Sequence, residues 1–128
     1  MTTYFGFAIA DSMFPDECNI RKTSLSVAEV RDQLANEGVE FVLNPSHWPT
    51  IEAARSRFDL AIAVPAKPPQ VLLGDGDSII VMGVRGLPRL TDRHEYTAGE
   101  IAGAAFSFSL YTVVHVRCSV QSVLRGNR

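Results

Sequence analysis

The sequence predicts a single α/β domain, in which a mixed β-sheet of about five to six strands is flanked by two to three helices. The length of 128 residues corresponds to one domain. The hydrophobic fraction of 46% and the charged fraction of 20% are typical of a folded globular chain. Short apolar runs alternate with helix-start patterns, and we expect the element order β-β-α-β-α-β-β-(α)-β.

The first third of the chain predicts two strands and a helix. Tyr4 to Ile9 is apolar and aromatic, which indicates a buried strand, and Cys18 to Thr23 indicates a short second strand. Ser26 and Glu29 have the spacing of a capping box, so a helix is expected to begin there. Gly38 is expected to end this helix as the residue beyond its C-terminus.

The remainder predicts a strand at 39–43, a helix at 49–58 and a last long strand at 105–116. Between them, 71–73 and 78–84 flank the turn Gly-Asp-Gly-Asp and predict a β-hairpin. A short helix is expected at 97–102, with Thr97 as its N-cap.

Charge and cysteine content exclude several function classes. A formal net charge of −2 provides no basic field for long DNA or RNA, so a nucleic-acid ligand must be small and held by local cations. Cys18 and Cys118 are far apart and lack the paired spacing of a zinc site or a disulfide framework. No apolar run reaches membrane-span length, and residues 1–10 lack the basic flank of a signal peptide, so we expect a cytoplasmic protein.

The segment Asn44-Pro45-Ser46-His47-Trp48-Pro49 is a strand-to-helix turn. The first N–H groups of a helix have no partners within it, so such a turn suits a phosphate. Because an imidazole titrates near neutral pH, His47 is a candidate general acid for a leaving oxygen. The alternative stays open that Ser46 only caps the helix and that His47 is an ordinary residue.

The segment from Arg85 to Glu95 is a second candidate. It carries Arg85, Arg89 and Arg93, whose planar guanidinium groups suit phosphate, and a loop of this length between strands is often functional. A solvated, salt-bridged connection explains the same pattern. Phe7, Trp48 and Tyr96 are aromatic side chains near these segments that could stack on bases or simply pack.

The arrangement resembles the archaeal-virus B116-like family, whose members include viral anti-CRISPR ring nucleases that cleave cyclic tetra-adenylate. The resemblance is carried by the first strand and loop, residues 4–14, and by Phe-Val-Leu-Asn-Pro-Ser-His-Trp-Pro-Thr-Ile at 41–51. Val64-Pro65 leading into 76–81, and Arg89-Leu90 followed by Asp92, complete it. It covers roughly residues 1–113 and leaves 114–128 as a C-terminal extension, whose last few residues we expect to be disordered.

This resemblance implies a homodimer with a ligand pocket across the two-fold axis, and no metal or other cofactor. The family's active histidine corresponds to His47, its phosphate-gripping arginine to Arg89 and its supporting carboxylate to Asp92. A ribose 2′-hydroxyl attacks the neighbouring phosphate in line, the histidine protonates the departing 5′-oxygen, and the arginine stabilises the charge on phosphate. The other residues implied in ligand binding are Phe7, Ala10, Asp11, Asn44, Ser46, Trp48, Arg85 and Arg93.

The chain also departs from the family. Where ring nucleases have Asn-Ala-Phe-Ser, this chain has Phe7-Ala8-Ile9-Ala10, which removes two polar contacts and adds an aromatic ring. Trp48 follows the histidine, and Asp92 is one methylene shorter than the usual glutamate. These changes favour a smaller ligand, or binding without cleavage.

Three functions stay open at this point. The first is a ring nuclease that degrades a cyclic oligonucleotide signal in the host cytoplasm. The second is a nucleotide-binding sponge or sensor of a virus or mobile element. The third is a structural or regulatory viral protein without a nucleotide ligand. His47 and Arg89 favour the first two, and Ala10 favours the second over the first.

Overall fold

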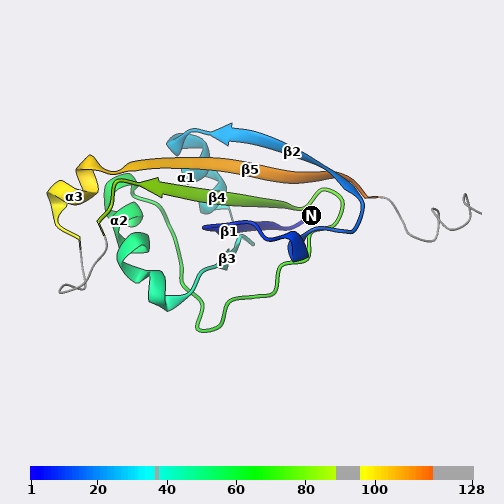
Figure 1. Cartoon of the computed structure of the whole chain (residues 1–128), viewed down its shortest axis with the longest axis horizontal. Helices are drawn as coiled ribbons and strands as arrows, with labels where there is room; N and C mark the ends of the chain where they lie inside the picture. Colours follow the sequence, from blue (N-terminus) through cyan, green and yellow to red (C-terminus); the bar gives the residue numbers. More distant parts are fainter. Residues whose placement is uncertain (37, 89–95, 117–128) are drawn as a thin grey trace, which may run out of the picture.

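A computed structural model describes residues 1–36, 38–88 and 96–116, and these form one five-stranded mixed sheet with the strand order β2-β5-β4-β1-β3 (Figure 1). The elements are β1 (Thr3–Gly6), η1 (Asp11–Met13), β2 (Cys18–Leu25), α1 (Val27–Ala35), β3 (Glu40–Val42), η2 (Pro45–His47), α2 (Trp48–Phe58), β4 (Ser78–Arg85), α3 (Ala98–Gly103) and β5 (Ala105–Val116). The predicted α/β class and mixed sheet are confirmed.

Strand β1 lies inside the sheet and is parallel to both of its neighbours. It pairs with β3 through Phe5 opposite Phe41, and with β4 through Phe5 opposite Ile80. Strand β5 is antiparallel to β4 and to β2. The carboxyl ends of β1, β3 and β4 therefore meet at one edge of the sheet, where α/β proteins commonly bind ligands.

One face of the sheet carries the main core. Because side chains alternate along a strand, Phe5, Ile80, Met82 and Phe108 point to the same face, and all four are buried. Helices α1 and α2 cover this face with buried side chains at Val30, Leu34, Ile51 and Ala54, in one continuous cluster.

The opposite face is covered near the start of β4 by irregular chain. Tyr4, Ile79 and Val113 form a second cluster there with Val71 and Leu73. The predicted hairpin between 71–73 and 78–84 is wrong, because 71–73 is not a strand and β4 pairs with β1 and β5 instead.

Two physical reasons explain this difference. The backbone N–H of Leu73 binds the carbonyl oxygen of Met13, 2.7 Å away. The N–H of Gly76 in the predicted turn binds the carbonyl oxygen of Val113. The segment before β4 is therefore held by distant parts of the chain and not by β4.

The predicted helix starts are confirmed. Ser26 Oγ accepts from the Glu29 N–H while Glu29 Oε1 accepts from the Ser26 N–H, which completes a capping box at α1. Thr97 and Glu100 form the same box at α3. Helix α1 ends at Ala35, earlier than expected from Gly38, because Asn36 already adopts an extended backbone. Gly38 has a φ of 94°, in the left-handed region that favours glycine.

Two arginines join the helices to one another. Arg31 of α1 donates a hydrogen bond to the carbonyl oxygen of Phe58 at the end of α2. Arg57 of α2 donates to the carbonyl oxygens of Ile101 and Ala104 at the end of α3. Each guanidinium binds carbonyl oxygens at the C-terminal end of a helix, which is the negative end of its dipole. The carbonyl oxygen of Ile101 also accepts from the Ala104 N–H, so Arg57 adds a second donor there.

Candidate functional site

The site is built where β1 and β3 end side by side. Phe7 directly follows β1, and the turn Asn44–His47 follows β3 and leads into α2 (Figure 1). The parallel register of Gly6 and Val42 places these two exits next to each other. The first strand and the strand-turn-helix segment, both singled out in the sequence, therefore share one edge of the sheet. We call this edge, with Phe7 and the turn Asn44–His47, the His47 edge.

The turn uses most of its own N–H groups. Asn44 Oδ1 accepts from the Ser46 N–H, and the Asn44 carbonyl oxygen accepts from the His47 N–H. The Trp48 N–H binds the carbonyl oxygen of Pro45. These N–H groups already have partners within the turn. We therefore expect an anion to be bound mainly by side chains here, and less by free N–H groups than the sequence indicated.

The imidazole of His47 packs against the ring of Phe7, with 5.4 Å between ring centroids and 46° between ring planes. Phe7 is partly buried and packs on the main core, whereas the His47 side chain is exposed. The core therefore fixes the ring of Phe7, and this ring packs against the solvent-exposed imidazole of His47. An imidazole in this position can exchange a proton with a bound ligand.

Two residues predicted to accompany His47 lie in another direction. After Phe7 the chain turns back along the sheet, and Ala10 and Asp11 begin η1 near the other end of β1 (Figure 1). Met13 and Phe14 pack there on the second cluster, with Tyr4 and Val113. Ala10 and Asp11 are exposed, and the structure does not bring them to the His47 edge.

The predicted cationic loop is described only at its start. Arg85 is exposed at the end of β4, opposite Ala105 of β5. By strand alternation it points to the sheet face opposite Val84, which packs on the main core. Arg89, Asp92 and Arg93 lie outside the described residues, so their predicted roles stay predictions.

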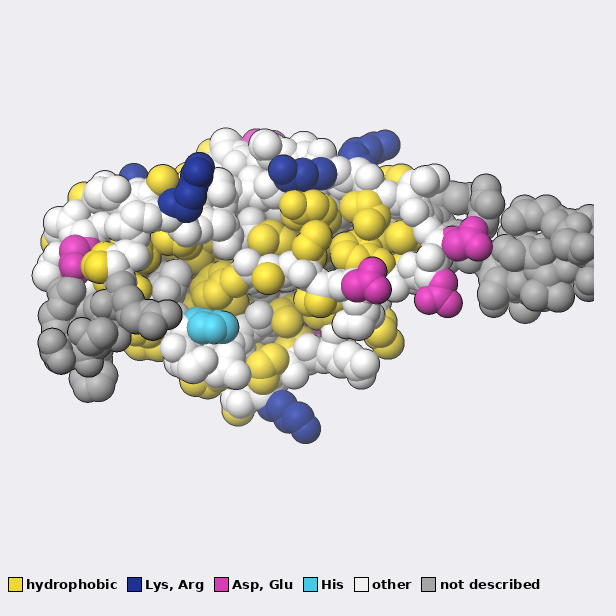
Figure 2. All heavy atoms as spheres, viewed as in Figure 1, with side chains coloured by type: hydrophobic (Ala, Val, Ile, Leu, Met, Phe, Trp, Pro, Cys, Tyr) yellow, Lys and Arg dark blue, Asp and Glu magenta, His cyan; other side chains and the backbone are white. Residues whose placement is uncertain are grey.

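Charged and hydrophobic side chains are unevenly distributed on one face of the molecule. Figure 2 shows hydrophobic side chains gathered over the middle of this face, with positive side chains along the border formed by β2. Arg21 and Lys22 of β2 are both exposed. A mildly acidic chain therefore still presents local positive charge.

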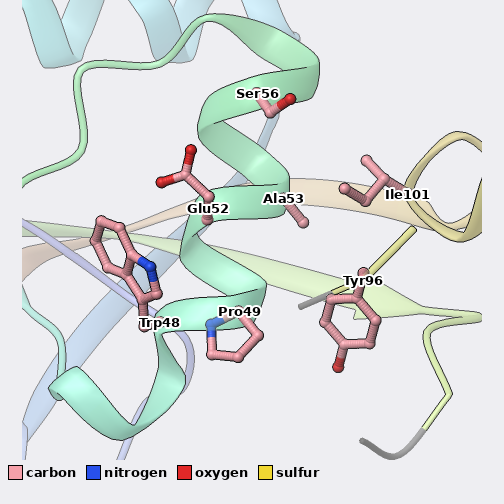
Figure 3. Close-up of a pocket in the computed structure, with 7 residues that line it drawn as sticks. All are labelled: Trp48, Pro49, Glu52, Ala53, Ser56, Tyr96 and Ile101. Atoms are coloured by element: carbon pink, nitrogen blue, oxygen red, sulfur yellow. The ribbon is translucent and has the colours of Figure 1, made fainter. Parts of the chain in front are cut away.

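A groove between α2 and α3 adjoins the turn and was not predicted as a site. A cavity of about 360 Å³ is lined by Trp48, Pro49, Glu52, Ala53, Ser56, Tyr96 and Ile101 (Figure 3). Pro49, Glu52, Ala53 and Ser56 follow the i, i+3, i+4, i+7 spacing of one helix face. That spacing was the available signal, but only the fold shows that Tyr96 and Ile101 face it.

Trp48 marks the end of the groove closest to His47. Its side chain is 41% exposed, which is unusual for so large an apolar group. The guanidinium carbon of Arg55 lies 5.6 Å from the Trp48 ring centroid, a cation–π arrangement. Of the predicted aromatic candidates, Phe7 contacts His47, Trp48 follows His47 directly in the chain, and Tyr96 lies across the groove from Trp48 (Figure 3).

The described part of the chain contains neither a cluster of metal-ligating side chains nor a membrane-spanning helix. Across 1–36, 38–88 and 96–116, His, Cys, Asp and Glu side chains form no group of three or more that could hold a metal ion. Within the same ranges, no helix is both long and apolar enough to cross a membrane.

Comparisons with known proteins identify a fold relative. No family model and no curated protein sequence matches this chain. The solved structure of "B116 of Sulfolobus turreted icosahedral virus (STIV)" is similar, with a TM-score of 0.65 over 88% of this chain and 99% of that one. At 15% sequence identity this similarity shows a shared fold with a viral protein, in agreement with the fold that the sequence resemblance implied.

Proposed function

We propose that this chain binds a cyclic oligonucleotide second messenger at the His47 edge and opens it without a metal ion. The observation that supports this proposal is the exposed His47 imidazole, held on the core-anchored ring of Phe7 where the parallel strands end. The B116-like fold and the resemblance noted at 41–51 favour the same activity. In this proposal the protein belongs to a virus or mobile element and blunts a host defence signal.

The proposed reaction is an internal transesterification. A ribose 2′-hydroxyl attacks the adjacent phosphorus, the bond from phosphorus to the 5′-oxygen breaks, and a 2′,3′-cyclic phosphate and a 5′-hydroxyl form. The attacking hydroxyl loses its proton to solvent, and protonated His47 gives a proton to the departing 5′-oxygen. Arg89 is proposed to stabilise the charge on phosphate, and Asp92 is proposed to act as the supporting, orienting carboxylate.

A pair of chains is part of the proposal. A cyclic oligonucleotide with two equivalent halves matches the symmetry of a two-fold dimer, in which each chain contributes one His47. Exposure of His47 at an edge, and not at the bottom of a closed cavity, is consistent with a site that a second chain completes.

The test is incubation of the protein with cyclic di-, tri-, tetra- and hexanucleotides, followed by chromatographic separation of products. We expect one ligand to be opened equally well with and without a chelator. His47→Ala and His47→Gln should both stop turnover while ligand-induced stabilisation against heat persists. Asp75→Asn, an exposed change in the turn before β4, is the control. Unchanged turnover in both His47 variants would overturn the assigned role.

A second candidate is a sponge that binds the signal without cleaving it. Ala10, which stands where the family has a serine, has no hydroxyl and lies with η1 away from the His47 edge. A ligand that raises the melting temperature and is recovered intact would support this function. If no ligand stabilises the protein, a structural role without a nucleotide is favoured.

A further inference from the structure

The groove between α2 and α3 is lined by small side chains of α2, two aromatic rings, one isoleucine and one acidic group. Pro49, Ala53 and Ser56 form the floor along α2 (Figure 3). Tyr96 and Ile101 lie on one side of it, and Trp48 and Glu52 on the other (Figure 3). An adjoining cavity of about 550 Å³ shares Ser56, Tyr96 and Ile101, so the groove continues along α3. Planar rings fit such a surface, because every nucleobase has a face that stacks on apolar and aromatic groups.

Glu52 is the charged group of this groove that can fix the orientation of a bound ligand. Its side chain is partly buried at the groove, and in the part of the chain that the structure describes no group donates a hydrogen bond to it or forms an ion pair with it. A carboxylate has two oxygens and, when ionised, only accepts hydrogen bonds. A ligand with two adjacent N–H donors would satisfy both oxygens at once.

We infer that this groove binds the base of a nucleotide and that Glu52 selects guanine over adenine. The inference rests on the proposed function, which it extends from the phosphate to the base, and it assigns this chain a base other than the adenine of the ring nucleases that its sequence resembles. Guanine presents its N1–H and its 2-amino group side by side, so both can donate to the Glu52 carboxylate. Adenine presents an amino group beside the N1 lone pair, and that lone pair faces a carboxylate oxygen without a proton between them.

Local charge favours a nucleotide over an organic cation. Arg55 and Arg57 both lie on α2 close to the groove, so they offset the single negative charge of Glu52. Arg57 is occupied by the α3 carbonyls, and Arg55 lies over the indole of Trp48. A phosphate-bearing ligand gains from these cations, whereas a cationic ligand meets repulsion from them.

The distance along α2 also suits one nucleotide. Glu52 lies one helical turn, a rise of about 6 Å, beyond Trp48, the first residue of α2, and His47 directly precedes Trp48. A base in the groove can therefore belong to the same nucleotide whose phosphate lies at the turn. Trp48, between the two positions, is placed to contact the sugar or the edge of the base.

The test compares GMP, IMP and AMP by equilibrium binding to the full chain. IMP keeps the N1–H of guanine but lacks the 2-amino group. We expect GMP to bind at least about tenfold more tightly than AMP, with IMP between them. Glu52→Gln should reduce the preference for GMP over AMP to less than about threefold. Asp32→Asn, an exposed carboxylate on α1, should leave the preference unchanged.

The outcomes separate this inference from the proposed function. Equal binding of GMP and AMP, or a preference that survives in Glu52→Gln, overturns the selection by Glu52, whatever happens to cyclic ligands. A Glu52-dependent preference for GMP, combined with no cleavage of any cyclic nucleotide, supports the groove and contradicts the ring-nuclease function. If none of the three nucleotides binds, and none of guanosine, inosine and adenosine binds either, the groove is not a base site. Melting temperatures of the variants check that each one folds.

Discussion

The guanidinium group of Arg57 donates a hydrogen bond to the carbonyl oxygen of Ile101 across 2.8 Å and so attaches α3 to α2. The same guanidinium lies 5.0 Å from the ring centroid of Phe58 and 5.3 Å from that of Phe106. One side chain therefore connects the end of α2, the end of α3 and the start of β5. Helix α3 has six residues and is too short to be stable alone, so its position depends on this contact.

Replacement of Arg57 by alanine is expected to lower the free energy of unfolding by about 1–2 kcal/mol, since charge-assisted hydrogen bonds and ring contacts are lost together. Lysine should restore only part of this, because it cannot reproduce the planar fork of donors. Urea denaturation measures the loss, and amide exchange at 98–103 shows whether it is centred on α3. Arg21→Ala on β2 is a control of equal charge. Similar effects of both substitutions would contradict the role given to Arg57.

A second prediction concerns acid stability through Asp77. Its carboxylate accepts from the Gly74 N–H and the Thr2 N–H, and these bonds, with the nearby N-terminal charge, hold the pKa of Asp77 below its ordinary value while burial opposes them. Because the folded pKa is the lower one, the resulting stability is present above the unfolded pKa and is lost as pH falls through the folded pKa.

Asp77→Asn should therefore destabilise the protein by about 1–3 kcal/mol at neutral pH and reduce the difference from wild type as the solution becomes strongly acidic. Melting temperatures measured from pH 7 down to pH 2 give both quantities. Asp75→Asn lies two residues away and has an exposed side chain, so its curve should follow that of the wild type. A constant gap between Asp77→Asn and wild type at all pH values would show that the carboxylate charge is not responsible.

The contact between β4 and β5 at Gly83 predicts a coupled pair of substitutions. A Cβ atom on Gly83 would lie 2.8 Å from Ser107 Oγ, which is too close unless the hydroxyl moves. Gly83→Ala is expected to cost up to about 1 kcal/mol, since overpacking forces a shift. In a Ser107→Ala background the same change should be neutral or stabilising, because alanine is favoured over glycine in a strand. A double-mutant cycle without any coupling energy would disprove this steric explanation.

The support of His47 by Phe7 is testable without a ligand. In the folded protein the Phe7 ring lies close enough to the imidazole to shift its carbon-bound proton resonances by ring current. Phe7→Leu should move these resonances toward their unstructured values, and Phe7→Tyr should preserve the shift. Proton NMR, with His47→Gln to assign the peaks, measures the effect. If the proposed function holds, Phe7→Leu should also lower turnover by about tenfold through a less well-oriented acid.

Features of the fold that depend on neighbouring residues were predicted from the sequence. The capping boxes at Ser26 and Thr97 involve partners three residues apart, and both helices begin where expected. The alternation of Phe106, Phe108 and Leu110 with serine and tyrosine predicted β5 with its observed bounds. The hairpin before β4 was predicted from a local turn pattern, but its backbone partners come from Met13 and Val113.

The same distinction between local patterns and long-range contacts applies to the candidate site. The turn that carries His47 was visible in the sequence because a strand end and a Pro-containing helix start are contiguous there. The capping side chain is Asn44, which accepts from the Ser46 N–H, and not Ser46, which the sequence offered as a cap. The contact of His47 with Phe7 needs the parallel pairing of β1 with β3, and the groove at Glu52 needs α3 to lie against α2. Neither pairing leaves a pattern within a short window, so sequence spacing could not show them.

The strand order also has a consequence for how the chain folds during synthesis. Strand β1 cannot pair with β4 until the residues after Asp77 have been made, and β2 has its only described partner in β5. Almost every sheet contact therefore joins distant parts of the chain, which slows folding. We expect the ribosome-bound chain to stay open until β5 emerges, and substitutions in β5 to reduce the yield of folded protein more than equally buried changes in α1.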